Sequence, residues 1–261
     1  MNRDERLSQL ADSIVLDGSI TVEDVIARFG VSAATVRRDL DELAQQQFIV
    51  RTRGGAALSP GSGELPLRYR SSRMGREKAE IAAAAVALIH PGDVIALNGG
   101  TTTTEIAQEL GRKCAADPAF TRDGVTVVTN AVNIAYELSV REQVRVVVTG
   151  GVARSRSYEL IGPLTELILP AIDVHTFFLG LDVINVERGI LTQNEGEAAV
   201  SASLARAAKR VIAVADHTKF SATGFARICA VSDLDLLITD SGAADSDVAA
   251  VREAGVEVQI A

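Results

Sequence analysis

TVEDVIARFGVSAATVRRDLDELAQQQFIVRTRGGAA, residues 21–57, has the pattern of two short helices joined by a tight turn and followed by two strands. Thr21 and Asp24 have the spacing of a capping box, in which each side chain accepts a hydrogen bond from the backbone at the start of a helix. A helix is therefore predicted from Val22. Gly30 follows where a left-handed residue commonly ends a helix.

A second helix is predicted after Ser32, which is placed to cap it. Val36, Leu40 and Leu43 recur on one face and form its buried stripe. Small residues and arginines share the opposite face. Small side chains let a helix approach the major groove closely, and arginine offers a planar set of donors for guanine edges or phosphate oxygens. The outward residues are Ala34, Thr35, Arg37, Arg38 and Asp41.

The segment after this helix has the pattern of a wing. Residues 48–53 alternate like a strand and end at Gly54 and Gly55, which can turn the chain along a phosphate backbone. Upstream, Arg6, Leu7, Leu10 and Ile14 indicate a supporting helix. Together these patterns predict a winged helix-turn-helix, with the helix-turn-helix at about residues 20–39. The expected DNA contacts are Ser32, Ala34, Thr35, Arg37, Arg38, Arg51 and Arg53.

Taken alone, Arg37 and Arg38 fit an ordinary solvated helix face. The surrounding pattern favours DNA recognition. VSAATVRRDLDEL at residues 31–43, followed by VRTRGGA at residues 50–56, resembles the amino-terminal signature of the DeoR family of bacterial transcriptional regulators nearly position for position.

The length of 261 residues predicts about two domains. We expect a DNA-binding domain at 1–58, a linker at 59–77 rich in Gly, Ser and Pro at its start, and an effector and oligomerisation domain at 78–261. No apolar run reaches the roughly 18 residues that cross a bilayer, and the charged start lacks a secretion signal. A cytoplasmic protein without membrane contact is therefore expected.

Cysteine and histidine spacing predicts neither a disulfide nor a metal site. Cys114 and Cys229 are far apart and have no CxxC partner, so buried free thiols are expected. The three histidines have no ligand spacing. We predict no cofactor.

The net charge of −8 is unevenly distributed. Residues 1–58 contain seven Lys or Arg and nine Asp or Glu, a net charge of −2. Residues 59–78 contain five Lys or Arg and two Asp or Glu, a net charge of +3, so residues 79–261 carry a net charge of −9. The acidic excess therefore belongs to the second domain. The basic stretch at residues 68–73 could contact flanking DNA or pack on an acidic second domain. Affinity for DNA should fall with salt according to the number of phosphates neutralised.

From Lys78 onward, apolar strands alternate with helical stretches, which predicts an α/β domain with a mainly parallel sheet and helices on both faces. In such sheets, ligands bind beyond the carboxyl ends of the strands. The predicted strands are 94–97, 125–128, 144–149, 176–179, 211–215, 236–238 and 256–260, and the predicted helices are 77–89, 103–110, 131–138, 197–209 and 245–253.

The first predicted strand end, residues 98–104, combines glycines with hydroxyls directly before a helix. Glycines allow close backbone approach, and N–H groups at a helix start bind anions, which favours a phosphate. A plain turn with a threonine cap is an equally good interpretation of this loop alone. It is neither a Walker loop nor a GxGxxG fingerprint. Further polar groups follow other strands: Thr129 with Asn130, Gly150 with Gly151, Asp182, Glu195 with Glu197, and Lys219.

The segments NGGTTTTEIA, VVTN, GG, SYELIG, FFLG, GEAAV, ADHTKF and LITD resemble the effector domain of the DeoR family in the family's own order. This resemblance implies a fold related to ribose-5-phosphate isomerase and coenzyme A transferases, and a phosphorylated sugar as effector. Asn98 is a departure from the resemblance, because the family often has Asp at this position. Within the family, the segments resemble regulators whose implied effector is a hexose or amino-sugar phosphate. The implied phosphate contacts are Gly99, Gly100, Thr101, Thr102 and Lys219, and the implied sugar contacts are Asn98, Thr129, Gly150, Gly151, Asp182 and Glu197.

The leading hypothesis is a repressor that binds double-stranded operator DNA, controls sugar or amino-sugar metabolism genes and responds to a sugar phosphate. It predicts a homo-oligomer, a dimer or tetramer, because a two-fold protein matches a palindromic site. The alternative is a sugar-phosphate isomerase or amino-sugar-phosphate deaminase carrying a DNA-binding domain. Asp182, Glu197 and Lys219 could then transfer protons. No positioned acid–base pair is evident in the sequence, so no catalytic residue is assigned.

Overall fold

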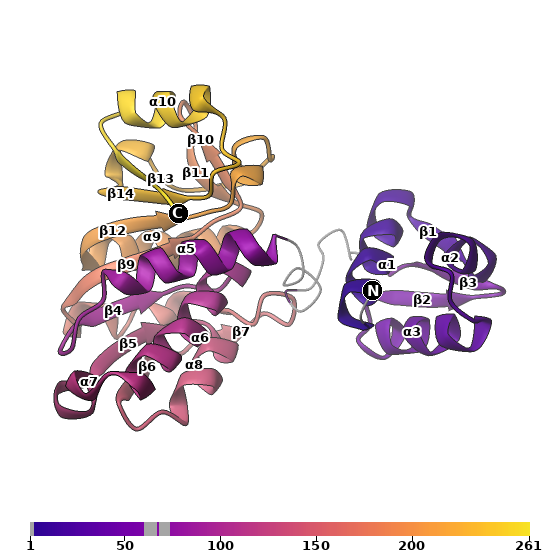
Figure 1. The fold of residues 1–261 in the computed structure, drawn as a ribbon, viewed down its shortest axis with the longest axis horizontal. Helices are drawn as coiled ribbons and strands as arrows, with labels where there is room; N and C mark the ends of the chain where they lie inside the picture. The colour runs from indigo at the N-terminus through magenta and orange to yellow at the C-terminus, as the bar shows by residue number, and fades with distance from the viewer. Residues whose placement is uncertain (1–2, 60–66, 68–73) are drawn as a thin grey trace. The chain divides into compact units, whose positions relative to one another are not determined.

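The computed structural model of the protein describes residues 3–59, 67 and 74–261. It divides the chain into two compact units, residues 1–73 and 74–261, which are described separately (Figure 1). Most of the predicted linker and the whole basic stretch at residues 68–73 lie outside the described residues.

Over residues 3–59, the smaller unit is three helices and a three-stranded antiparallel sheet of order β1-β3-β2. The predicted capping box is present, since the Asp24 amide donates to Thr21 Oγ1 over 3.1 Å and the helix begins at Val22. Gly30 ends this helix at a φ of 65°, the left-handed conformation that favours glycine. The elements are α1 (Arg3–Asp17), β1 (Ser19–Thr21), α2 (Val22–Phe29), α3 (Ala33–Gln45), β2 (Ile49–Thr52) and β3 (Gly55–Leu58).

The core of the smaller unit is formed by the faces that the apolar periodicity predicted. Leu7, Leu10 and Ile14 of α1 pack with the stripe of α3, and all of these side chains are buried. Strand residues complete the same core from the wing. Burial of these apolar side chains is the main term that holds the three helices on the sheet.

An ion pair between α1 and α3 lies at the edge of this core. Arg6 Nε donates to Asp39 Oδ2 over 2.7 Å, and the Asp39 side chain is only 2% exposed. The hydrogen bond to Asp39 raises the pKa of Arg6 above its ordinary value. The apolar pattern of α3 did not predict a buried carboxylate, because Asp39 is polar and lies between two positions of the apolar stripe. The pair fixes α1 against the helix that carries the predicted DNA contacts.

We expect Asp39→Ala to destabilise the smaller unit by about 3 kcal/mol, because it leaves the partly buried guanidinium of Arg6 without its partner. Native-state hydrogen exchange of the α1 and α3 amides measures this loss. The more exposed ion pair of Arg3 and Glu42 provides a control, since Arg3→Ala should lower the free energy of unfolding by less than about 1 kcal/mol. Equal effects of the two variants would contradict a special role for the buried pair.

The larger unit is built on a seven-stranded parallel sheet of order β15-β14-β12-β9-β4-β5-β6. Each of the seven predicted strands is present, with ends that differ by a few residues, and the predicted α/β fold is confirmed. The strands are β4 (Val94–Leu97), β5 (Val125–Thr129), β6 (Val144–Val148), β9 (Val174–Gly180), β12 (Ala208–Val214), β14 (Leu236–Thr239) and β15 (Glu257–Ile260).

Helices cover both faces of the sheet, as predicted (Figure 1). One apolar cluster joins α5, α6, α7 and α8 to one face, and a second joins α9 and α10 to the other. Alternate strand residues point to opposite faces, so Leu97 belongs to the first cluster and its neighbour Ala96 to the second. The helices are α5 (Gly75–Ala87), α6 (Thr101–Ala116), α7 (Pro118–Asp123), α8 (Val132–Ser139), α9 (Glu195–Ala207) and α10 (Asp245–Glu253).

Several short elements of the larger unit were not predicted. A hairpin is formed by β7 (Val152–Ala153) and β8 (Leu160–Ile161), and a small antiparallel sheet by β10 (Val183–Asn185), β11 (Gly189–Thr192) and β13 (Ala226–Cys229). Segments of two to four residues are too short for a periodic pattern. Four 3-10 turns are also present: η1 (Pro163–Thr165), η2 (Leu169–Ala171), η3 (His217–Phe220) and η4 (Val231–Asp233).

Both cysteines are free thiols. Cys114 is buried and Cys229 is half-buried. Burial raises the pKa of Cys114 to about 11 and that of Cys229 to about 12, so neither is a reactive thiolate at neutral pH. Within the part of the chain that the structure describes, no helix is long and apolar enough to pass through a membrane, and no cluster of His, Cys, Asp and Glu is suited to a metal.

Candidate functional site

The exposed face of α3 carries the predicted recognition residues. Ser32 caps the helix, with the Thr35 amide donating to its hydroxyl over 3.2 Å. Arg37 and Arg38 are exposed, and their guanidinium groups bond to no residue that the structure describes. Ser32 and Ala34 are also exposed, and Thr35 is half-buried. Donors that no described residue occupies can be used for DNA.

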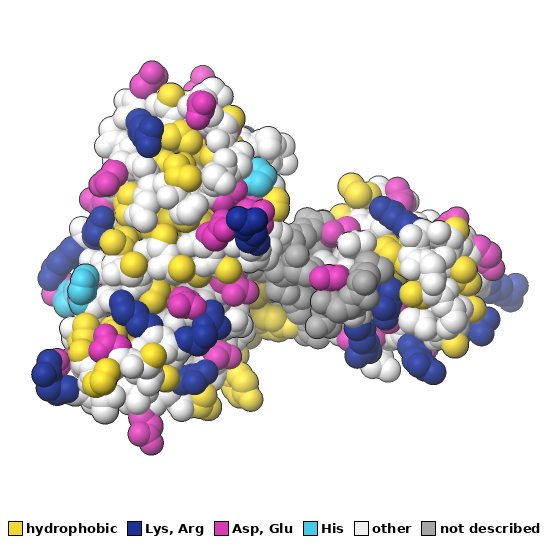
Figure 2. Space-filling model, in the orientation of Figure 1, with side chains coloured by type: hydrophobic (Ala, Val, Ile, Leu, Met, Phe, Trp, Pro, Cys, Tyr) yellow, Lys and Arg dark blue, Asp and Glu magenta, His cyan; other side chains and the backbone are white. Residues whose placement is uncertain are grey.

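The wing follows α3 directly. Gly54 has a φ of 92° at the turn between β2 and β3, and Arg53 beside it is exposed. Arg51 lies closer to α3, where its Nη1 is 3.4 Å from Asp41 Oδ1 and 3.5 Å from the carbonyl oxygen of Arg37. Arg51 therefore connects the wing strand to α3 as well as facing solvent. Figure 2 shows several basic side chains on the surface of the smaller unit.

In the larger unit, the carboxyl end of β4 leads through Asn98, Gly99 and Gly100 into α6. Gly100 has a φ of 146° and supplies no side-chain cap to the helix. The hydroxyls of Thr103 and Thr104 donate to its carbonyl oxygen over 3.2 and 2.6 Å. The amides of the first helical turn thus have no side-chain acceptor at the helix start, which is the arrangement that binds anions. Thr101 is half-buried and Thr102 is buried in this turn.

Asn98 is buried, and its side chain is used within the protein. Its Nδ2 donates to the carbonyl oxygen of Gly180 over 2.8 Å and to Ser201 Oγ over 3.1 Å. Its Oδ1 accepts from the Gly180 amide over 2.8 Å. Both amide hydrogens are therefore engaged by β9 and α9. The side chain holds the end of β4 to the neighbouring strand, and it positions the loop that follows.

Glu159 of the β7–β8 hairpin lies against this loop. A Cβ atom on Gly99 would stand 2.3 Å from Glu159 Cγ, so only glycine leaves room for this side chain. Glu159 Oε2 accepts from Asn130 Nδ2 over 2.9 Å. Burial, reinforced by the charges of Glu197 and Asp182, raises the pKa of Glu159 to about 8, although hydrogen bonds from Asn130 and the Gly99 backbone oppose the shift.

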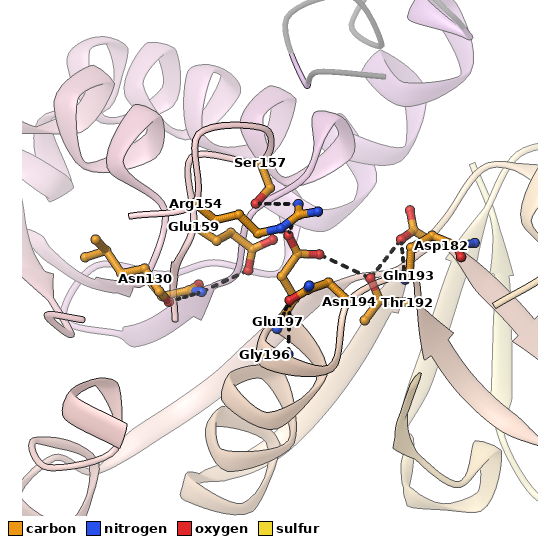
Figure 3. Close-up of polar contacts among 11 residues, drawn as sticks. Asn130, Arg154, Ser157, Glu159, Asp182, Thr192, Gln193, Asn194, Gly196 and Glu197 are labelled. Carbon is orange, nitrogen blue, oxygen red and sulfur yellow. Dashed lines mark hydrogen bonds and ion pairs between the residues drawn. The ribbon is translucent and has the colours of Figure 1, made fainter. Parts of the chain in front are cut away.

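A polar network continues from the hairpin to the start of α9 (Figure 3). Arg154 Nη1 lies 2.8 Å from Glu197 Oε1, and the Glu197 side chain is 7% exposed. Thr192 Oγ1 is 3.3 Å from Glu197 Oε2 and 2.8 Å from Asp182 Oδ2. Asn194 caps α9 by accepting from the Glu197 amide over 3.1 Å. Glu197 and Asp182 are therefore brought together at the Thr192 hydroxyl.

The side chains of Thr129 and Lys219 make no hydrogen bond to this network among the described residues, and Gly150 and Gly151 offer no side chain for one. Thr129 is buried and its hydroxyl accepts from the Ala131 amide over 3.0 Å. Gly150 and Gly151 have φ values of 82° and 119°, and a Cβ on Gly151 would be 2.5 Å from Thr165 Cγ2. Lys219 is half-buried in η3 after β12, which is separated from β4 by β9.

Arg154, Glu159 and Thr192 are among the residues of the network that were not predicted as site residues. Glu159 falls inside the SYELIG segment, but no periodicity distinguishes it from a surface glutamate. Its position depends on a hairpin of two-residue strands. The geometry around Gly99 is what reveals it.

The smaller unit has an exposed arginine face beside a wing, and the larger unit has a parallel sheet with polar groups at its strand ends. Together these two units define a DNA-binding regulator with a sensor domain. Comparison with known families agrees. Residues 6–60 match the DeoR-like helix-turn-helix domain, and residues 73–241 match the DeoR C terminal sensor domain. The chain belongs to the DeoR family of transcriptional regulators.

Relatives are similar over nearly the full chain. A protein of Escherichia coli O157:H7, provisionally named an aga operon transcriptional repressor, is 36% identical over 97% of this chain and 92% of its own length. The HTH-type transcriptional repressor GlcR of Bacillus subtilis is 34% identical over 92% of this chain and 89% of its own. Ribose 5-phosphate isomerase A of Methanocaldococcus jannaschii superposes with a TM-score of 0.43 and 18% identity, covering 56% of this chain and 55% of that one.

Proposed function

We propose that the protein is a repressor of sugar-related genes whose affinity for operator DNA changes when a sugar phosphate binds in the larger unit. The observation that carries this proposal is the uncapped start of α6 at Gly100, directly after a buried strand end. An uncapped helix start offers backbone amides and the positive end of the helix dipole to an anion. The relatives named as repressors of sugar-related operons, including one of the glycerol-3-phosphate regulon, support it.

In this proposal, the phosphate binds the backbone of Gly99, Gly100, Thr101 and Thr102. Asp182 and Glu197 accept hydrogen bonds from sugar hydroxyls, because they are adjacent and carry acceptor oxygens toward the same network. We assign Asn98 the task of holding the loop, since its amide hydrogens are engaged. Thr129, Gly150, Gly151 and Lys219 remain proposed contacts from the neighbouring strand ends.

We further propose that the protein acts as a homo-oligomer in the cytoplasm, where operator DNA lies, and that it does not turn over its ligand. One winged helix touches too few bases for a specific site, and a two-fold protein presents two to a palindrome. Arg154 pairs with Glu197, so this carboxylate is engaged by a cation. That pairing favours a binding role over proton transfer.

A thermal-shift screen tests the effector class. Hexose, amino-hexose and pentose phosphates are each compared with the unphosphorylated sugar. A true ligand at one hundred times its dissociation constant should stabilise the larger unit by about 2.7 kcal/mol, because it binds only the folded state. We expect the phosphate ester to shift the melting temperature and the free sugar not to do so.

The same panel separates sensor from enzyme. Each compound that shifts melting is incubated with the protein and the product mixture is followed by NMR. Binding without conversion is the expected result. Equal shifts from glucose and its phosphate ester would count against the anion loop, and rapid isomerisation or deamination would assign the site to the alternative function.

A further inference from the structure

The loop at Gly99 already holds a carboxyl group of the chain itself, that of Glu159. A Cβ on Gly99 would lie 2.6 Å from Glu159 Cδ and 2.7 Å from Glu159 Oε1, so the carboxyl group rests directly on the Gly99 backbone. The Gly99 backbone also acts on this group, since it opposes the rise in the pKa of Glu159. A backbone amide bound to a carboxylate oxygen makes the same kind of contact that it makes with a phosphate oxygen.

The Glu159 side chain is enclosed. It is 4% exposed, with Gly99 on one side and Asn130 Nδ2 at 2.9 Å on another. Glu197, which is also buried, lies close enough for its charge to oppose ionisation of Glu159. Figure 3 shows the two glutamates directed toward each other from the hairpin and from α9. A rotation of the side chain alone has little room, so the carboxyl group can leave the loop only if the hairpin moves.

We propose that Glu159 is an internal competitor of the effector: the phosphate group takes the place of the Glu159 carboxyl group at Gly99 and lifts the β7–β8 hairpin from the loop. This inference rests on the proposed function, because it assumes that the same loop receives the phosphate. Two anionic groups cannot share one set of backbone donors, and like charges in a desolvated site repel strongly.

The hairpin is attached in a way that suits such a movement. Two backbone hydrogen bonds join it to the β5–α8 connection: the Leu160 amide donates to the Asn130 carbonyl over 2.6 Å, and the Val132 amide to the Tyr158 carbonyl over 2.9 Å. Asn130 Nδ2 adds two more, to Glu159 Oε2 over 2.9 Å and to the Leu160 carbonyl over 3.2 Å. Tyr158 has a φ of 60°, a left-handed conformation that costs free energy in a bulky residue.

Movement of the hairpin would reach α9. Arg154 of the hairpin loop pairs with Glu197, and a Cβ on Gly196 would be 2.9 Å from Ile161 Cδ1, so the loop and β8 both contact the first turn of α9. Displacing the hairpin therefore breaks an ion pair and uncovers a helix start. A ligand can change a distant affinity only through such a difference between two states.

Charged groups around Glu159 come from three directions. Glu197 lies on α9, Asp182 follows β9, and Arg154, on the hairpin itself, is bound to Glu197. The β5–α8 side presents the neutral Asn130. The surroundings are therefore acidic. Because the pKa of Glu159 is raised to about 8, its carboxyl group is mostly protonated at pH 7 and mostly ionised at pH 9.

Titration calorimetry with inorganic phosphate and with glucose 6-phosphate tests the inference in the full-length protein. We expect Glu159→Ala, which vacates the loop, to bind both probes at least about tenfold more tightly than the wild type at pH 9, because an ionised competitor is removed. Glu159→Gln keeps the volume and removes the charge. It should match the wild type at pH 7 and bind more tightly at pH 9, where the wild type weakens.

Glu187→Ala removes an exposed carboxylate elsewhere in the unit and should leave both affinities unchanged. Equal or weaker binding of the probes by Glu159→Ala, with binding by the wild type intact, would overturn the competitor role and leave the proposed function standing. Failure of all variants and the wild type to bind either probe would overturn both, because the loop would then receive no phosphate.

Hydrogen exchange gives a second measurement that a merely structural glutamate would not affect. We expect the Leu160 amide of the wild type to exchange faster in saturating phosphate, because its bond to Asn130 opens when the hairpin lifts. In Glu159→Ala the phosphate enters a vacant loop, and the Leu160 rate should not rise. Slower exchange of Leu160 in the liganded wild type would contradict the displacement.

Discussion

Replacing Arg38 by alanine should abolish operator binding in a gel-shift titration, with a fall in affinity of at least about 100-fold. A bidentate contact from arginine to a base is worth about 1–3 kcal/mol, and a two-fold protein loses the contact in both subunits. Arg38 is exposed on α3, and its guanidinium bonds to no described residue, so its removal should not unfold the smaller unit. Binding of the sugar phosphate should be unchanged.

The operator for this experiment is selected from random DNA by the wild-type protein. Arg122→Ala is the control, since Arg122 is also an exposed arginine, at 78%, and lies on the larger unit. Comparing the selected site with scrambled DNA distinguishes two roles. Loss confined to the selected site indicates base recognition, whereas uniform weakening with a smaller salt dependence indicates a phosphate contact. Full affinity of Arg38→Ala would remove α3 as the recognition helix.

Replacing Gly99 by alanine should lower affinity for the sugar phosphate by about 100-fold, because the methyl group occupies the side from which an anion approaches the backbone. The new Cβ would stand 2.7 Å from Glu159 Oε1, at the position that we propose for a phosphate oxygen. Gly99 does not have a positive φ, so the substitution introduces no backbone strain of that kind. Calorimetry with the best ester from the thermal-shift screen measures the loss.

Gly75→Ala is the control, because a Cβ at Gly75 meets no atom within 4 Å. It should bind the ester as the wild type does. Operator binding by Gly99→Ala in the absence of ester should persist, which separates a defective pocket from a defective fold. Normal affinity of Gly99→Ala for the ester would place the phosphate away from this loop.

Local rules predicted the helices and strands of both units well. A capping box needs only residues three positions apart, so Thr21 and Asp24 were sufficient to locate the start of α2. A parallel sheet buries its strands on both faces, which leaves apolar runs that are visible in the sequence. The order β15-β14-β12-β9-β4-β5-β6 was beyond such rules, because strand neighbours are chosen by packing between distant segments.

Local sequence rules likewise predict some features of the candidate site and not others. The amino-acid sequence alone determined the two-domain plan, the arginine face of α3 and the glycine-threonine loop before α6, because each depends on residues a few positions apart. Only the tertiary structure decided that Glu159 lies on Gly99, that Arg154 pairs with Glu197 and that Asn98 is engaged by Gly180. These contacts join residues that are 43, 60 and 82 positions apart in the sequence. No local pattern encodes which distant segment will cover a loop.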